Sequence, residues 1–299
     1  MNQIIYAIVV TYNALRWVDK CLGSLQTSSV PVHTIVIDNA SGDNTVAYIR
    51  DKFPDVHLIE SKINLGFAKA NNIGIKHALD QGADYIFLLN QDAWVEEDTL
   101  SVLPGNFEEQ PALGIVSPLH LNGDKSGLDW MFIDYMPTEF TSDLYFNRFK
   151  SFYHLPFVNA AAWLISTSCI NRVGGFDTSL FTHYGEDTNY CQRVLYHGFE
   201  IGINTKCTIC HDREFRKNGE SEYRNQIFAD EQRWRKIELG DINIELDIDT
   251  LIAKNKLSVR KATFKLLLKK AARHKQEIEF LMQIKRSREL NKKGGLVWL

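Results

Sequence analysis

Two acidic motifs in the chain have the composition and placement to do chemistry. Asn90-Gln91-Asp92 directly follows the apolar residues 85–89, and an Asp at the open end of a buried strand is a good ligand for a divalent cation that also binds a diphosphate. Glu186-Asp187 opens an amphipathic segment over residues 188–197, where a carboxylate can act as general base on a hydroxyl nucleophile. Each motif also has a structural interpretation, because Asp92 can cap a turn and acids are favoured at helix N-termini.

A third motif, Cys207-Thr208-Ile209-Cys210-His211, matches the C-x-x-C-H pattern of c-type haem attachment. It lies in an apparent strand of a chain without a visible export signal, which disfavours haem. A zinc site would need a fourth ligand that the neighbouring sequence does not offer. We therefore expect the two cysteines to be core residues.

The glycine pattern excludes two large classes of nucleotide-binding protein. No two glycines are spaced as G-x-G, and residues 1–22 contain no glycine. The dinucleotide-binding turn of dehydrogenases and the Walker A loop of P-loop NTPases are therefore both missing. The absence of a Gly-rich basic loop after the first strand also argues against a sugar nucleotidyltransferase.

The elements that must position these motifs alternate along the first 120 residues. Short apolar runs predict strands, and helical periodicity lies between them. The strands are expected at residues 4–10, 34–38, 56–60, 85–90 and 114–117, with helices near 14–28, 43–53, 68–81 and 96–110. This order predicts an α/β fold with a Rossmann-like, mostly parallel, doubly wound sheet. Ligands of such sheets bind outside the carboxyl ends of the strands, so Thr11-Tyr12-Asn13, Asp38-Asn39 and Asn90-Gln91-Asp92 matter most.

The alternation stops after residue 117. Residues 118–155 mix aromatic side chains with Asp and Asn, which fits either an irregular insertion stabilised by aromatic packing or an acceptor-binding loop. Residues 156–212 return to strand, helix and strand. A helix is expected at 221–239, and one or two basic helices at 256–293.

The composition is that of an ordinary soluble globular protein, with 299 residues, 44 % hydrophobic and 24 % charged. The longest apolar stretches, residues 4–10 and 160–165, are far shorter than the roughly 20 residues that cross a bilayer. The N-terminus lacks the basic region of a signal peptide, and the five cysteines are an odd, scattered set. We therefore expect a cytoplasmic protein with reduced thiols.

The net charge of −3 hides a strong asymmetry. Residues 254–293 contain 14 Lys or Arg and 3 Glu, or +11, so the rest of the chain has 20 basic and 34 acidic residues, or −14. The basic segment fits either peripheral binding to an anionic lipid surface, at the inner face of the cell membrane, or a helical pair that packs on the body or on a subunit partner. The acidic body opposes nucleic-acid binding, so no nucleic-acid partner is expected.

Taken together, the motifs resemble the family 2 inverting glycosyltransferases with the GT-A fold, particularly the rhamnosyltransferase-like bacterial members. The resemblance extends over roughly residues 3–212. The motifs that carry it are residues 9–13, 35–43, 64–68, 71–74, 88–92, Gly174-Gly175-Phe176-Asp177, Glu186-Asp187 and His211.

The resemblance implies a nucleotide site at the first strand ends. There Asp38 would accept a hydrogen bond from the pyrimidine N–H, and the other residues would border the base, the ribose or the phosphates. The implied nucleotide-binding residues are Thr11, Tyr12, Asn13, Asp38, Asn64, Gly66, Phe67 and Asn90.

The resemblance also implies the catalytic groups. Asp92 matches the last Asp of the family's D-x-D motif, whose first position is Asn90 here, and with His211 it would hold Mg²⁺ or Mn²⁺. Asp187 matches the general base, and Glu186 is the alternative.

The implied activity is that of a glycosyltransferase of the hexosyltransferase type. It would move rhamnose or a hexose from a UDP- or dTDP-sugar to a hydroxyl of a surface polysaccharide or a lipid-linked oligosaccharide, by single displacement. The alternatives are a sugar nucleotidyltransferase and a non-catalytic nucleotide- or glycan-binding scaffold.

The expected organisation is a GT-A catalytic domain over residues 1–220, followed by a basic helical extension over 221–299. Within the catalytic domain the nucleotide-binding half covers about 1–117 and the acceptor half about 118–220. A homo-oligomer is left open by the sequence.

Overall fold

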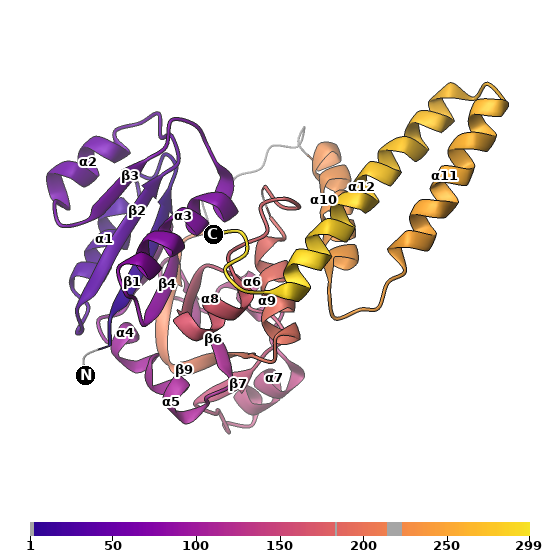
Figure 1. The fold of residues 1–299 in the computed structure, drawn as a ribbon. Helices are drawn as coiled ribbons and strands as arrows, with labels where there is room; N and C mark the ends of the chain where they lie inside the picture. The colour runs from indigo at the N-terminus through magenta and orange to yellow at the C-terminus, as the bar shows by residue number, and fades with distance from the viewer. Residues whose placement is uncertain (1–2, 183, 214–222) are drawn as a thin grey trace.

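The computed structural model describes residues 3–182, 184–213 and 223–299, which form one large sheet with helices on both faces and a helical hairpin at the C-terminal end (Figure 1). The strands are β1 (Ile5–Thr11), β2 (Val32–Asp38), β3 (His57–Glu60), β4 (Tyr85–Asn90), β5 (Ala93–Val95), β6 (Leu113–Asn122), β7 (Phe152–His154), β8 (Ala162–Ser166) and β9 (Glu200–His211). The helices are α1 (Val18–Gln26), α2 (Thr45–Lys52), α3 (Gly66–Asp80), α4 (Thr99–Val102), α5 (Gly105–Glu109), α6 (Trp130–Ile133), α7 (Thr138–Tyr145), α8 (Thr167–Val173), α9 (Glu186–Tyr196), α10 (Tyr223–Gly240), α11 (Ile248–Phe264) and α12 (Leu268–Lys293).

The sheet has the strand order β3-β2-β1-β4-β8-β6-β9-β5, and β7 pairs with β9. Strands β3, β2, β1 and β4 are parallel, with Thr11 opposite Asp38 and Val10 opposite Asn90. This register places the carboxyl ends of β1, β2 and β4 at one edge. Beyond β4 the sheet is mixed, since β8 runs antiparallel to both β4 and β6.

Hydrophobic side chains fill both faces of the sheet. Helices α1, α2 and α4 cover one face, and α3, α6, α7, α8 and α9 cover the other. Because β4 is central, its residues 86–89 are buried on both sides, as their continuous apolar run predicts. Gly74 lets α3 lie close to the sheet, since a Cβ there would come within 2.6 Å of Ile8.

The predicted alternation is confirmed over β1–β4 and α1–α3, but the helix expected at 96–110 is wrong. The chain forms two short helices there, α4 and α5. Pro104 lies between them, and proline has no N–H for a helical hydrogen bond.

The segment 118–155 is less irregular than predicted. Strand β6 continues to Asn122, and α6, α7 and β7 follow. Aromatic packing does stabilise this segment: Phe132 and Phe140 are buried, and the Phe140 and Tyr153 rings meet edge to face at 5.3 Å.

The basic segment expected at 256–293 forms α11 and α12, which run side by side as a hairpin that projects from the body (Figure 1). The inner part of α12 is bound to the body through Asp177, whose Oδ2 accepts hydrogen bonds from Ser287 and, at 3.1 Å, from Asn291. After α12 the chain returns to the body, where the Gly175 N–H donates to the Val297 carbonyl at 2.9 Å. Among the described residues, no helix is long and apolar enough to span a membrane.

Candidate active site

The ends of β1 and β2 are joined by a buried carboxylate. Asp38, only 2 % exposed, accepts hydrogen bonds from the Thr11 hydroxyl at 3.0 Å, from the Ser41 N–H at 2.9 Å and from the Ser41 hydroxyl at 2.5 Å. A carboxylate has about four acceptor positions, so three are already engaged by the protein. The interaction of Asp38 with a pyrimidine N–H remains a prediction. The N–H would have to use the fourth acceptor position or replace one of the three present donors.

The loop before α3 is held by Asn39, which the sequence placed at a strand end without a specific contact. Its Nδ2 donates to Asn64 Oδ1 at 3.0 Å, and its Oδ1 accepts from the Leu65 N–H at 2.7 Å. Gly66 follows with φ of 78°, a conformation that favours glycine. Phe67 lies against Phe176, with ring centroids 5.7 Å apart. The loop that the sequence places beside the nucleotide is therefore pinned to the end of β2.

A second backbone clamp links the ends of β1 and β4. The Gln91 side chain accepts from the Tyr12 N–H at 2.7 Å and donates to the Tyr12 carbonyl at 3.3 Å. Asn13, with φ of 51°, accepts from the Gly42 N–H at 2.8 Å. The Tyr12 ring is exposed, so this edge combines a fixed backbone with an accessible aromatic face.

Asp92 and His211 meet although 119 positions separate them in the chain. Strand β5 begins directly after Asp92 and pairs with β9 so that Ala93 lies opposite His211, and the Asp212 N–H donates to the Asp92 carbonyl at 2.8 Å. Asp92 Oδ1 lies 3.3 Å from His211 Nε2, and both residues are buried. The pairing of β5 with β9 thus brings together the two residues that the sequence assigns to a metal.

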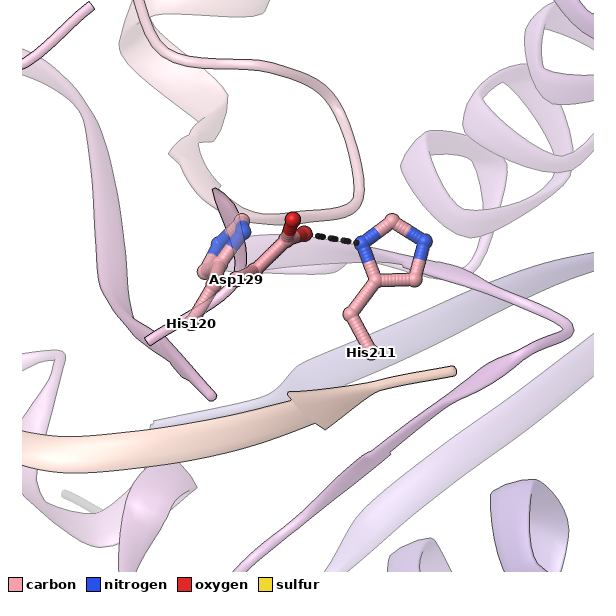
Figure 2. A group of neighbouring side chains, drawn as sticks. All are labelled: His120, Asp129 and His211. Atoms are coloured by element: carbon pink, nitrogen blue, oxygen red, sulfur yellow. Dashed lines mark ion pairs between the residues drawn. The ribbon is translucent and has the colours of Figure 1, made fainter. Parts of the chain in front are cut away.

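The other ring nitrogen of His211 faces Asp129, which the sequence analysis missed (Figure 2). His211 Nδ1 lies 3.2 Å from Asp129 Oδ2, and Arg213 Nε donates to the same oxygen at 2.7 Å. Burial alone would raise the pKa of Asp129, but hydrogen bonding by His211 and Arg213 and the Arg213 charge hold it well below its usual range. Asp129 also caps α6 by accepting from the Met131 N–H at 3.0 Å. Its position before a helix could predict the cap, but no local signal predicts the histidine.

His120 completes a buried group with Asp129 and His211, whose candidate ligand atoms all lie within 4.8 Å of one another (Figure 2). The His120 Nε2 is 2.9 Å from the Ser117 hydroxyl, and burial, followed by the nearby His211, lowers the pKa of His120 well below its usual value. An ion held by these three residues would sit beside the Arg213 guanidinium, which repels it. We therefore interpret Asp129 as the partner that orients His211, with His120 a neutral neighbour.

The residues on the Asp92 side fit a divalent cation. Two ligands of an octahedral Mg²⁺ site at about 2.1 Å from the metal are about 3 Å apart when adjacent, close to the 3.3 Å between Asp92 Oδ1 and His211 Nε2. Both ring nitrogens of His211 are buried without a hydrogen bond of full geometry among the described residues, so Nε2 faces Asp92 and Nδ1 faces Asp129 at ion-pair distance. A histidine ligand whose other nitrogen meets a carboxylate is a common arrangement in metal sites.

The Glu186-Asp187 pair forms the first turn of α9, after Gly185 with φ of 92°. Glu186 is 6 % exposed, and burial together with the neighbouring Asp187 charge raises its pKa. Asp187 is half-buried, and its Oδ1 accepts from the Thr188 N–H at 2.7 Å. Burial raises the pKa of Asp187 against the opposing hydrogen bonds from the Thr188 and Ala160 backbones. A carboxylate with a raised pKa is a stronger general base.

Tyr135 lies within electrostatic range of both acidic groups. The charges of Asp129, Arg213 and Asp187 all act on its hydroxyl, which accepts from the Asn159 N–H at 3.4 Å.

The two cysteines of the C-x-x-C-H motif lie in the core of the sheet. Cys207 and Cys210 are buried free thiols of β9, and burial raises the pKa of Cys207 to about 12. The group of converging ligand side chains found within the described residues contains neither cysteine. Both are core residues, as expected.

Comparisons with known proteins identify relatives of the chain. The model of the family described as "Glycosyl transferase family 2" matches residues 6–174. The "dTDP-rhamnosyl transferase RfbF" of Shigella flexneri is 27 % identical over 215 residues, which cover 71 % of this chain and 70 % of that protein. The "N-acetylglucosaminyl-diphospho-decaprenol L-rhamnosyltransferase" of Mycobacterium tuberculosis is 24 % identical over 219 residues, 65 % of this chain and 71 % of that protein.

A solved structure shares the fold over almost the whole chain. It is the mannosyltransferase PcManGT from Pyrobaculum calidifontis in complex with GDP-Man and Mn²⁺, with a TM-score of 0.58 and 16 % identity. The match covers 98 % of this chain and 87 % of that one.

Proposed function

The chain belongs to glycosyl transferase family 2 and has the GT-A fold, and from that membership we propose that this glycosyltransferase is an inverting enzyme that uses a UDP- or dTDP-sugar. The observation that carries the proposal is the contact of Asp92 with His211 at the carboxyl-end edge of the sheet. Their 3.3 Å separation and burial suit a cation that binds a sugar diphosphate.

The names of the two relatives support a particular donor and acceptor. One is a dTDP-rhamnosyl transferase, and the other transfers L-rhamnose to a lipid-linked N-acetylglucosaminyl diphosphate. We therefore propose rhamnose, or a hexose, as the sugar and a hydroxyl of a growing surface polysaccharide or of a lipid-linked oligosaccharide as the acceptor.

In the proposed mechanism the donor lies across the ends of β1, β2 and β4. The fixed Tyr12 and Asn13 backbones and the pinned loop of Asn64, Gly66 and Phe67 border the nucleotide. Thr11 and Asp38, which are hydrogen-bonded to each other, would close the end of the base pocket, and Asn90 at the end of β4 would lie beside the phosphates.

Asp92 and His211 would hold Mg²⁺ or Mn²⁺, which when bound supplies positive charge to the departing diphosphate. Asp129 holds the far side of the His211 ring, and Arg213 balances the charge of Asp129. The protein thus fixes the ligand imidazole before the donor arrives.

Asp187 would take the proton from the acceptor hydroxyl as that oxygen attacks the anomeric carbon on the face opposite the diphosphate. Asp187 is half-buried as a residue, whereas Glu186 is buried and its raised pKa favours the neutral form. We assign the general base to Asp187, and Glu186 is its buried neighbour.

The test is steady-state turnover of dTDP-rhamnose and UDP-hexoses with a lipid-linked N-acetylglucosaminyl diphosphate acceptor and Mn²⁺. Asp187→Asn is expected to lower kcat about 10²–10⁴-fold, the contribution of a general base, with the donor KM near that of wild type. Asp55→Asn, an exposed aspartate before β3, is the control and should retain full activity.

Three results would contradict the proposal. Full activity of Asp187→Asn would remove the base assignment. Consumption of a sugar phosphate and a nucleoside triphosphate, with release of pyrophosphate, would identify a nucleotidyltransferase. Donor binding with no transfer by the wild type would identify a non-catalytic scaffold.

A further inference from the structure

The outer part of the α11–α12 hairpin is a strongly basic arm. This arm, residues 250–276, contains nine Lys or Arg and no Asp or Glu. All nine basic residues are exposed, and within the part of the chain that the structure describes none of them forms an ion pair. They are Lys254, Lys256, Arg260, Lys261, Lys265, Lys269, Lys270, Arg273 and Lys275.

The tip of this arm, residues 264–268, exposes four apolar side chains beside Lys265. Phe264 is 90 % exposed, Leu266 82 %, Leu268 69 % and Leu267 47 %. The tip is the part of the hairpin farthest from the body (Figure 1), so no other described element packs on it. Four large apolar side chains gathered at one exposed point are uncommon in a soluble protein and mark an interaction site.

The turn at the tip does not need these apolar side chains in order to form. The Leu267 N–H donates to the Ala262 carbonyl at 2.8 Å and the Leu266 N–H to the Thr263 carbonyl at 3.0 Å, the pattern of a Schellman helix end. Leu266 occupies its left-handed position, with φ of 55°, where glycine is the usual residue and an L side chain is strained. The turn would be more stable with glycine, so its folding does not require Leu266.

The hairpin is stabilised at its other end. Ile252, Leu281 and Ile284 are buried with Phe181 and Ile237 of the body. Lys285 also bonds Asp249 at 2.7 Å across the two helices. The apolar contacts that stabilise the hairpin therefore lie at its end next to the body, and the apolar side chains of the tip take no part in them.

We propose that the tip inserts its apolar side chains into the surface of an anionic lipid bilayer, with the basic arm bound to the headgroups. The pattern of charged and apolar residues favours a lipid bilayer as the partner of the tip. Apolar residues flanked by Lys and Arg match the acyl boundary and the anionic headgroups of a bilayer. A second copy of the chain would bring two sets of nine like charges together, which opposes self-association through the tip.

The arm also sets the orientation of the protein on the membrane. The rest of the chain outside 254–293 carries −14, so an anionic surface repels the body while it attracts the arm. The hairpin would then hold the body away from the headgroups. This inference does not rest on the proposed reaction, because vesicle binding requires neither donor nor acceptor.

The first test is sedimentation of the full chain with phosphatidylcholine vesicles that contain or lack phosphatidylglycerol. Wild type should bind only the anionic vesicles. Each basic residue near an anionic surface contributes about fivefold in affinity (about 1 kcal/mol), so Lys265→Gln/Lys269→Gln/Lys270→Gln should bind roughly a hundredfold more weakly. Lys52→Gln/Lys76→Gln/Lys206→Gln removes three exposed lysines of the body and should bind like wild type.

The second test separates the apolar tip from the charge. Leu266→Gly removes one apolar side chain and relieves the strained φ, so we expect unchanged or higher thermal stability with weaker vesicle binding. Because all five native cysteines are buried, an environment-sensitive fluorophore on Leu266→Cys labels the tip selectively. Its emission should shift to the blue on anionic vesicles, whereas the same label on Lys52→Cys should not respond.

Several outcomes would overturn the inference. These are no binding of wild type to anionic vesicles, equal binding to neutral vesicles, or no response of the Leu266→Cys label. If Phe264→Ser/Leu266→Ser/Leu268→Ser binds vesicles like wild type but changes a dimer into a monomer, the tip is a subunit contact. Donor binding, which reports on the proposed function, should be unchanged in every tip variant.

Discussion

The two ring nitrogens of His211 face two different carboxylates, so this residue connects the two acidic side chains of the site. Nε2 lies 3.3 Å from Asp92 and Nδ1 lies 3.2 Å from Asp129. If the proton is on Nδ1, the Nε2 lone pair is directed toward Asp92 and the proposed cation. Asp129 therefore acts as a positioning residue, and it should affect metal affinity although it does not contact the metal itself.

The expected result for Asp129→Asn is Mn²⁺ binding that is weaker by about 10–100-fold, the usual effect of removing the partner of a ligand histidine. Mn²⁺ affinity is measured directly by titration calorimetry or by the electron paramagnetic resonance signal of free Mn²⁺. Asp134→Asn, an exposed aspartate just after α6, is the matched control. Equal affinities of wild type and Asp129→Asn, with both folded, would show that His211 needs no such support.

Glu186 predicts a pH dependence of stability. Burial and Asp187 raise its pKa in the folded state, while Arg233 opposes the shift. Between the unfolded pKa, near 4.5, and the higher folded pKa, the folded state therefore holds a proton that the unfolded state has lost. The free energy of unfolding should fall as pH rises across that window, by about 1.4 kcal/mol per pH unit for one proton.

Glu186→Gln should remove this loss, so its stability relative to wild type should increase from pH 5 upward. Urea unfolding of both proteins at a series of pH values measures this difference in the free energy of unfolding. Glu245→Gln, at an exposed position, should show no such trend. A constant difference between Glu186→Gln and wild type at all pH values would mean that Glu186 is not held protonated by the fold.

At the scale of elements, the parallel register explains why the sequence could predict which strand-end residues lie together. The apolar runs fix β1, β2 and β4, and parallel pairing brings their ends to one edge. Thr11, Asp38 and Asn90 follow from that rule alone. Their hydrogen-bond partners could not be predicted, since Ser41 and Asn39 act through loop conformations that no periodicity specifies.

The proposed metal ligands Asp92 and His211 are brought together by a strand pairing that the sequence pattern does not show. His211 reaches Asp92 because the three-residue strand β5 pairs antiparallel with β9. A strand of that length gives no periodic signal, so only the family resemblance pointed to His211. Asp129 lies in a segment predicted to be irregular, and its contact depends on the path of the chain between β6 and α6.

In the helical extension the sequence pattern predicted the helices but not which of their apolar residues are buried. Apolar residues recur at helical intervals through 256–293, but the structure buries Leu281 and Ile284 while it exposes Leu257, Phe264 and Met282. Periodicity identifies a helix without telling which of its apolar residues find a partner. The arm and its tip are visible only once the hairpin is known to project from the body.

At the scale of the whole molecule, the charge distribution links the site to the arm. The donor carries a negative diphosphate, and the body that binds it is itself negative. A cation at Asp92 would remove this conflict locally, while the arm would supply attraction to an anionic surface where the proposed lipid-linked acceptor would lie. We propose that the donor and acceptor sites occupy residues 1–220 and that residues 221–299 serve docking.

The most direct test of the account is the shift in melting temperature caused by dTDP-rhamnose and UDP-hexoses with and without Mn²⁺ or Mg²⁺. We predict that at least one of these donors raises the melting temperature of wild type only when the cation is present. At a hundredfold excess over Kd this corresponds to about 2.7 kcal/mol. Asp92→Ala should lose the effect, and Asp55→Ala should keep it. Equal stabilisation of wild type and Asp92→Ala, or no stabilisation by any pyrimidine nucleotide sugar, would contradict a cation-dependent donor site at Asp92.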